Sequence, residues 1–210
     1  MNIKIVHANI SEPFCQYEKY LPFITKERQD KINRFHFDKD KIISLFAEIL
    51  MRNEISKELN IPFDEIVFGH GEHGKPYLLN NRDYHFSVSH SGNCIAFVGS
   101  EFSIGIDIEQ ISDGNLDIAK RFFTDNEFHF IQNNKEPKNA FYQIWTSKEA
   151  YVKMLGLGLS KGFQTFDVLS DELKHLFCYQ QVSEYMLTVC SEINDGKLSI
   201  TQISAEELLK

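Results

Sequence analysis

The sequence has few of the features that mark secreted, zinc-binding or membrane proteins. Its four cysteines, Cys15, Cys94, Cys178 and Cys190, are scattered and form no C-x-x-C pair. This pattern argues against a cysteine-based zinc site and a disulfide framework, so we expect a reduced, cytoplasmic protein. Residues 1–14 carry no long apolar run or cleavage-site pattern, so we expect no signal peptide. No apolar stretch has the length of a membrane span, and we expect no membrane partner.

Basic residues are also in short supply. The 210 residues include 22 Lys and Arg against 30 Asp and Glu, a formal net charge of -8. Proteins with a broad nucleic-acid surface normally carry a basic patch, so we expect no nucleic-acid partner. An anionic ligand must therefore be held by a few local cations. The hydrophobic share of 42% and the charged share of 25% are typical of a globular domain.

The most informative stretch is residues 104–109, Ile-Gly-Ile-Asp-Ile-Glu. As a strand, it places its isoleucines on one face and Asp107 and Glu109 together on the other, because side chains alternate. Neighbouring carboxylates repel each other unless a cation or solvent lies between them, and hard oxygen ligands suit Mg²⁺. An ordinary half-buried strand with a wet acidic face explains the same alternation.

A helix is predicted over residues 137–155, and it carries a second group of charged residues. Trp145, Glu149 and Lys153 follow one another at four-residue spacing, so they form a line along the helix. Lys148 falls within the apolar stripe, where its ammonium group requires a carboxylate or a bound phosphate. Glu149 and Lys153 also have the spacing of an exposed surface ion pair, and this alternative remains open.

The remaining periodicity predicts further helices and strands. Helical segments are expected at 14–37, 38–59, 116–123 and 125–132. Strands are expected at 2–8, 66–68, 85–92, 94–98, 166–169, 177–182, 186–191 and 198–203. Short gaps between the C-terminal strands favour antiparallel pairing. The order of elements fits an α+β fold of two similar halves, residues 1–102 and 103–210, each a small, mostly antiparallel sheet on a long helix.

Four short motifs follow one another along the chain. They are Gly74-Lys75-Pro76, residues 85–91 (His-Phe-Ser-Val-Ser-His-Ser), residues 105–109 (Gly-Ile-Asp-Ile-Glu), and residues 145–150 (Trp-Thr-Ser-Lys-Glu-Ala) with Lys153 behind them. Each motif is weak alone. In this order and spacing, they resemble the phosphopantetheinyl transferases of the type that activates surfactin synthetase. The resemblance implies two halves related by a pseudo-two-fold axis, with a ligand cleft between them.

The resemblance also implies a reaction. It is transfer of the 4'-phosphopantetheine group from coenzyme A to a serine of an apo acyl or peptidyl carrier protein, releasing adenosine 3',5'-bisphosphate. It implies a monomer that uses Mg²⁺, with Mn²⁺ as the alternative, held by Asp107, Glu109 and Glu149. Such a transfer depends mainly on positioning and on stabilisation of charge, which a metal site of this kind supplies.

The same resemblance assigns roles to further residues. Lys153 and His90 are expected to contact the pyrophosphate, and Lys148 to support the same charge cluster. Glu149 is expected to take the serine proton, directly or through a metal-bound water. The other residues expected to bind coenzyme A are Arg28, Lys31 and Ser44 at the 3'-phosphate, and Lys75, Pro76 and Ser89 at the adenine nucleotide.

Two alternatives and one local question stay open. The carboxylates would also serve another Mg-dependent phosphoryl-transfer enzyme, and the cleft would serve a non-catalytic binder of coenzyme A or a carrier protein. A pure binder would not require the full set Asp107, Glu109, Glu149 and Lys153. Residues 111–123, where the family meets its carrier protein, are apolar at Leu116, Ile118, Phe122 and Phe123; these side chains dock a carrier helix or belong to the core.

Overall fold

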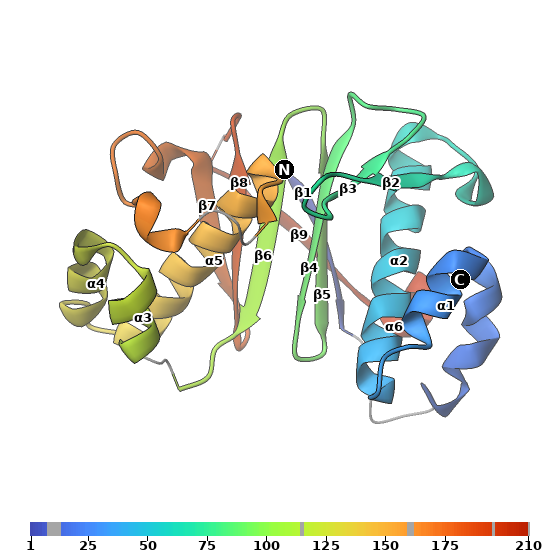
Figure 1. Ribbon diagram of the computed structural model, residues 1–210, viewed down its shortest axis with the longest axis horizontal. Coiled ribbons are helices and arrows are strands. Elements are labelled where there is room, and N and C mark those ends of the chain that lie inside the picture. The colour runs from blue at the N-terminus through green and yellow to red at the C-terminus, as the bar shows by residue number, and fades with distance from the viewer. Residues whose placement is uncertain (8–13, 114–115, 159–161, 195, 210) are drawn as a thin grey trace.

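The computed structural model describes residues 1–7, 14–113, 116–158, 162–194 and 196–209. Two sheets lie face to face between two long helices, which gives the order α2, first sheet, second sheet, α5 (Figure 1). The first sheet has the strand order β4-β5-β1-β9, and the second has the order β6-β8-β7. The predicted α+β fold is confirmed.

The first half is built on α2 (Asp38–Leu59). Leu45, Phe46 and Leu50 of this helix belong to one apolar cluster with Phe86 and Phe97 of the first sheet. The strands of this sheet are β1 (Asn2–His7), β4 (His85–Ser91), β5 (Cys94–Ser100) and β9 (Ser199–Ser204). The small elements around it are η1 (Phe14–Phe23), α1 (Lys26–Ile32), η2 (Phe63–Glu65), β2 (Phe68–His70), β3 (Pro76–Leu78) and α6 (Ala205–Leu208).

The second half is built on α5 (Pro137–Leu155), which begins with a proline in its first turn and ends at Gly156 in the left-handed conformation. Its strands are β6 (Ile104–Gln110), β7 (Phe177–Val182) and β8 (Tyr185–Ser191). The short helices are α3 (Leu116–Phe122), α4 (Asp125–Gln132), η4 (Phe163–Thr165) and η5 (Lys174–Leu176). Among the described residues, none of the helices has the combined length and apolarity that a membrane span requires.

The alternation predicted for residues 104–109 is confirmed. Ile104, Ile106 and Ile108 are fully buried in the cluster between the two sheets, together with Ile3 and Ile5 of β1. The opposite face of β6 carries the acids and packs against α5. Side chains of β6 therefore alternate between the apolar cluster between the two sheets and the side of the strand that faces α5.

Three sequence predictions need correction. Residues 166–169 do not form a strand; they follow η4 as a turn, and the buried Phe166 packs beside α5 instead of pairing in a sheet. The helical prediction for 14–37 becomes η1 and α1, and α1 ends at Ile32. The last strand pairs in parallel with β1, not antiparallel within the second half, so residues 199–208 return to the first half.

Gly105 marks the place where β6 passes closest to α5. A Cβ atom here would lie 2.0 Å from the Ala150 carbonyl oxygen and 2.5 Å from the Met154 amide nitrogen. Gly105→Ala must push strand and helix apart, so we expect it to lower the free energy of unfolding by about 1–3 kcal/mol in urea denaturation. Gly162→Ala is the control, because its Cβ would meet only Thr165 Cγ2, at 3.6 Å. Equal stability of the two variants would contradict this packing.

Candidate active site

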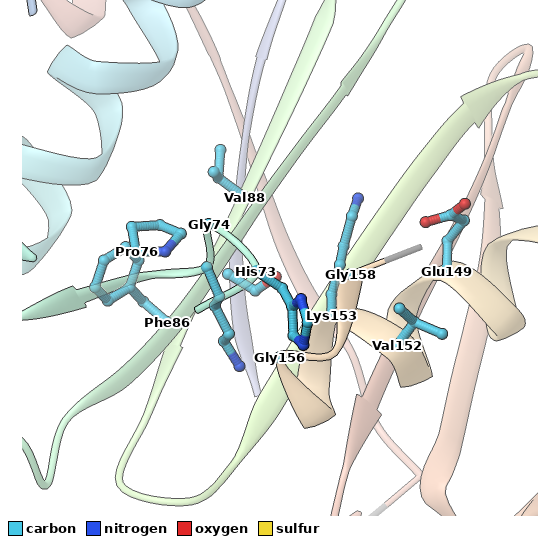
Figure 2. Close-up of a pocket in the computed structure, with 12 residues that line it drawn as sticks. His73, Gly74, Pro76, Phe86, Val88, Glu149, Val152, Lys153, Gly156 and Gly158 are labelled. Atoms are coloured by element: carbon cyan, nitrogen blue, oxygen red, sulfur yellow. The ribbon is translucent and has the colours of Figure 1, made fainter. Parts of the chain in front are cut away.

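A cavity of about 250 Å³ lies at the junction of the two halves (Figure 2). The first half contributes the loop of residues 73–76 and three residues of β4, Phe86, Ser87 and Val88. The second half contributes Glu149 and Lys153 of α5 and the glycines that follow the helix. Four predicted site residues line this cavity: Lys75, Pro76, Glu149 and Lys153.

Asp107 is the centre of a compact hydrogen-bonded group. The Lys153 ammonium group lies 2.6 Å from Asp107 Oδ1 and 2.8 Å from Ser89 Oγ. The Ser89 hydroxyl donates to the same carboxylate oxygen at 2.7 Å. Asp107 is only 3% exposed, and its second oxygen, Oδ2, is buried with no hydrogen-bond partner. A buried carboxylate oxygen without a partner is costly, and a bound cation would remove that cost.

The two other acids adjoin this group. Burial raises the pKa of Glu109, and the charge of Asp107 raises it further, against hydrogen bonds from Ser91 and Trp145 and the charge of Lys153. Burial and the charge of Asp107 also raise the pKa of Glu149, while Lys153 lowers it. Two acids whose ionisation is disfavoured beside the charge of Asp107, with Lys153 to balance them, make this a site that attracts a further cation.

The three predicted metal ligands do not converge around one point. Among the residues that the structure describes, no three His, Cys, Asp or Glu side chains are already arranged to hold a metal ion. Lys153 provides the cation that Asp107 contacts. The acids are therefore neighbours that share an electrostatic field, and their side chains must move before they can share a metal.

A separate predicted group lies on α1 and α2. Arg28 Nη2 donates to Ser44 Oγ at 2.9 Å, and its Nε lies 3.3 Å from an oxygen of the buried Glu48. Lys31 is exposed on the same short helix as Arg28. His90 lies on β4, where loss of solvent and the charge of Lys153 lower its pKa. The structure thus brings Arg28 and Ser44 together, as the sequence predicts.

The structure contradicts the prediction that Lys148 supports this charge cluster. Its side chain is fully buried, and its ammonium group lies 2.8 Å from Glu127 Oε2 of α4. It also donates to the carbonyl oxygens of Phe163 and Phe166, at 2.6 and 2.7 Å. The anion that a buried lysine requires is therefore a protein carboxylate, and Lys148 fastens α4 and the η4 segment to α5.

Of the apolar side chains predicted in residues 111–123 to dock a carrier helix or to belong to the core, some are buried and some are exposed. Phe123 is 4% exposed and belongs to the core beneath α5. Ile118 is partly buried against the same core, whereas Leu116 and Phe122 are 47% and 43% exposed. Two of the four apolar side chains are thus available at the surface of α3.

Sequence reasoning missed two serines of β4. Ser87 and Ser91 flank Ser89 at alternate positions, and the hydroxyls of both contact β6. Their alternation, Ser-x-Ser-x-Ser, was the available signal, because it places three hydroxyls on one face of a strand.

A cavity between two α+β halves, lined by two lysines and by a glutamate of raised pKa, has the features of an enzyme that handles an anionic substrate. Comparison with known proteins defines the class. The family model described as "4'-phosphopantetheinyl transferase superfamily" matches residues 103–203, and that described as "4'-phosphopantetheinyl transferase, N-terminal" matches residues 12–102. This chain belongs to the 4'-phosphopantetheinyl transferase superfamily and is an enzyme of that class.

Individual relatives agree along the length of the chain. It is 34% identical over 224 residues to 4'-phosphopantetheinyl transferase Sfp of Bacillus subtilis, covering 99% of this chain and 100% of that protein. It is 32% identical over 200 residues to 4'-phosphopantetheinyl transferase gsp of Aneurinibacillus migulanus, covering 88% and 84%. The L-aminoadipate-semialdehyde dehydrogenase-phosphopantetheinyl transferase of Rattus norvegicus is 30% identical over 163 residues, covering 69% of this chain and 53% of that protein.

Proposed function

We propose that the enzyme transfers 4'-phosphopantetheine from coenzyme A to a serine hydroxyl of an apo acyl or peptidyl carrier protein, as a cytoplasmic monomer. The serine oxygen forms a bond to the β-phosphorus, the pyrophosphate bond breaks, and adenosine 3',5'-bisphosphate leaves. The observation that carries the proposal is the group of Asp107, Ser89 and Lys153 beside Glu149 at the cavity between the halves.

The residues of α5 supply the charge and the base for this step. Lys153 lies at the cavity, so its ammonium group can balance negative charge that develops on the leaving phosphate. The raised pKa of Glu149 makes it a stronger base than an exposed glutamate. Glu149 is therefore the residue that we assign to take the serine proton, directly or through a water molecule.

Asp107, Glu109 and Glu149 would hold Mg²⁺, with Mn²⁺ as the alternative. The unpaired, buried Oδ2 of Asp107 fits this role, and so does the set of hard carboxylate oxygens. When bound, the ion supplies positive charge that neutralises the pyrophosphate oxygens. The protein's own part is to place these three acids near one another.

The remaining contacts to coenzyme A are assigned to both halves. Arg28 and Lys31 would bind the 3'-phosphate with Ser44, since Arg28 is already held in place by Ser44 and Glu48. The residues assigned to the adenine nucleotide and the pyrophosphate are Lys75, Pro76, Ser89, His90 and Lys153. Lys148 is left out of this set because its partner is Glu127.

The test is a change in mass. The full chain is incubated with an apo-carrier protein, coenzyme A and Mg²⁺, and the carrier should gain one phosphopantetheine group. A carrier whose acceptor serine is replaced by alanine is the matched control and should gain nothing. No gain across several carriers, with tight binding of coenzyme A, would favour a non-catalytic binder. Phosphate release from simple esters without coenzyme A would favour another phosphoryl-transfer enzyme.

Lys75 gives the proposed coenzyme A site a pH dependence. Its ammonium group donates to the carbonyl oxygens of Ile104 and Met154, and burial lowers its pKa to about 8. The charge is present below that pH and is lost above it, so affinity for anionic coenzyme A should fall as pH rises. We expect a severalfold higher Kd at pH 9 than at pH 7 by titration calorimetry. Lys75→Met should bind coenzyme A weakly at both pH values. If the Kd of this variant still rises between pH 7 and pH 9, the assignment to Lys75 is contradicted.

A further inference from the structure

Three serine hydroxyls of β4 join the two halves of the molecule. β4 belongs to the first sheet and β6 to the second, and the two strands are not paired by backbone hydrogen bonds in the described sheets. Ser87 Oγ accepts from the Ile106 amide at 3.1 Å, and Ser89 Oγ donates to Asp107 Oδ1 at 2.7 Å. Ser91 makes the third connection. The junction beside the cavity is therefore bridged by side chains.

Ser91 makes two hydrogen bonds that fix the direction of its hydroxyl. Its Oγ accepts from the Gln110 amide at 3.0 Å and donates to Glu109 Oε2 at 2.6 Å. A serine hydroxyl has a single hydrogen, so once Oγ faces the amide, that hydrogen is directed to the carboxylate. A hydrogen bond of this length to an ionised acceptor belongs to the strong class. The Glu109 carboxylate is thus held from two sides, by Ser91 of the other half and by a hydrogen bond from Trp145 of α5.

We propose that Ser91 is a positioning residue for the metal site, holding Glu109 in the orientation in which it binds the divalent cation. This inference rests on the proposed function of Glu109 as a metal ligand. Carboxylates that bind metals are themselves held by hydrogen bonds, and loss of such a partner weakens metal binding. Ser91 needs no contact with coenzyme A for this role. Through Ser91, the geometry of the metal site depends on the packing of β4 against β6.

Ser87 provides a matched comparison. It lies on the same face of the same strand and also bonds to β6, but its hydroxyl accepts from a backbone amide and contacts no carboxylate in any hydrogen bond of the described residues. Ser87→Ala therefore removes a connection between the halves without removing a partner of Glu109. Ser91→Ala removes a connection between the halves and also the hydrogen bond to Glu109. A difference between the two variants isolates the contact with the carboxylate.

The test measures Mn²⁺ binding to the full chain by electron paramagnetic resonance, with coenzyme A present and with protein-free Mn²⁺ and coenzyme A subtracted. Ser91→Ala should raise the Mn²⁺ Kd about tenfold. Ser91→Thr keeps the hydroxyl and should stay close to the original affinity. Because Ser87 also lines the cavity, the variants are compared at saturating coenzyme A, where Ser87→Ala should lower the melting temperature and leave the Mn²⁺ Kd unchanged. If Ser91→Ala does not fold, Ser91→Cys takes its place, because a thiol is a weak donor of similar size.

The outcomes separate this inference from the proposed function. Asp107→Ala should remove Mn²⁺ binding; if it does not, the proposed metal site itself is wrong. If it does, but Ser91→Ala binds Mn²⁺ as Ser87→Ala does, the role of Ser91 is overturned while the metal site stands. Equal weakening in Ser91→Thr and Ser91→Ala would also overturn it, because the hydroxyl would then not matter.

Discussion

Replacing Asp107 by alanine is expected to lower the rate of phosphopantetheine transfer about 10³-fold, the upper range for loss of one preorganised electrostatic group. Asp107 accepts hydrogen bonds from both Lys153 and Ser89, so its loss leaves the lysine without its carboxylate partner. It also removes the only buried, unpaired carboxylate oxygen among the described residues. One substitution thus affects the proposed metal site and the position of the cation that faces the substrate.

The measurement is the rate of mass gain by an apo-carrier in a single turnover, with saturating coenzyme A. Asp107→Asn tests charge apart from shape, because the amide fills the same space, and it should be nearly as inactive as alanine. Asp171→Ala is the control, since that aspartate is almost fully exposed and its ion pair with Lys174 lies at the surface, outside residues 111–123. An Asp107→Asn enzyme with more than a tenth of the original rate would count against the central role of this carboxylate.

Replacing Glu127 by alanine is expected to lower the free energy of unfolding by about 3–5 kcal/mol, because it leaves the Lys148 charge buried without a partner. Both side chains of this ion pair are 0% exposed. Glu127 also accepts from the backbone amides of Thr124 and Val168, so its loss removes the first-turn cap of α4 as well.

Urea denaturation gives the comparison directly. The double variant Glu127→Gln with Lys148→Met has no charge at this buried pair, and it should be more stable than Glu127→Ala alone. Asp113→Ala is the control, because its ion pair with Lys138 lies at the surface and contributes little to the free energy of unfolding. The folded double variant should bind coenzyme A with the original Kd. A large loss of affinity for coenzyme A in that variant would show that Lys148 contributes to the coenzyme A site.

Much of this site could be predicted from local pattern. Alternation in residues 104–109 was enough to place Asp107 and Glu109 on one face, since a strand allows no other arrangement. Helical spacing likewise placed Glu149 and Lys153 on the same line of α5, and both line the cavity. These predictions depend on the geometry of one element and hold wherever that element packs.

The predictions that failed depended on contacts between distant elements. The composition of α5 showed that Lys148 needs an anion, but the choice between a phosphate and Glu127 depends on how α4 packs against α5. The apolar residues 166–169 mimic a strand because Phe166 and Val168 enter the core from a turn. The parallel pairing of β9 with β1 joins residues almost 200 positions apart, and no local signal reports it.

The pairing of β9 with β1 determines when the first half can complete its fold. Ala205 and Leu208 of α6 are buried against α2, and β9 supplies the neighbour of β1 in the first sheet. On the ribosome, residues 1–100 therefore emerge without their closing strand and stay incomplete until residues 199–208 are released. Folding of the two halves is coupled through the tail, and such long-range closure favours slow, concerted assembly over sequential folding of one half and then the other.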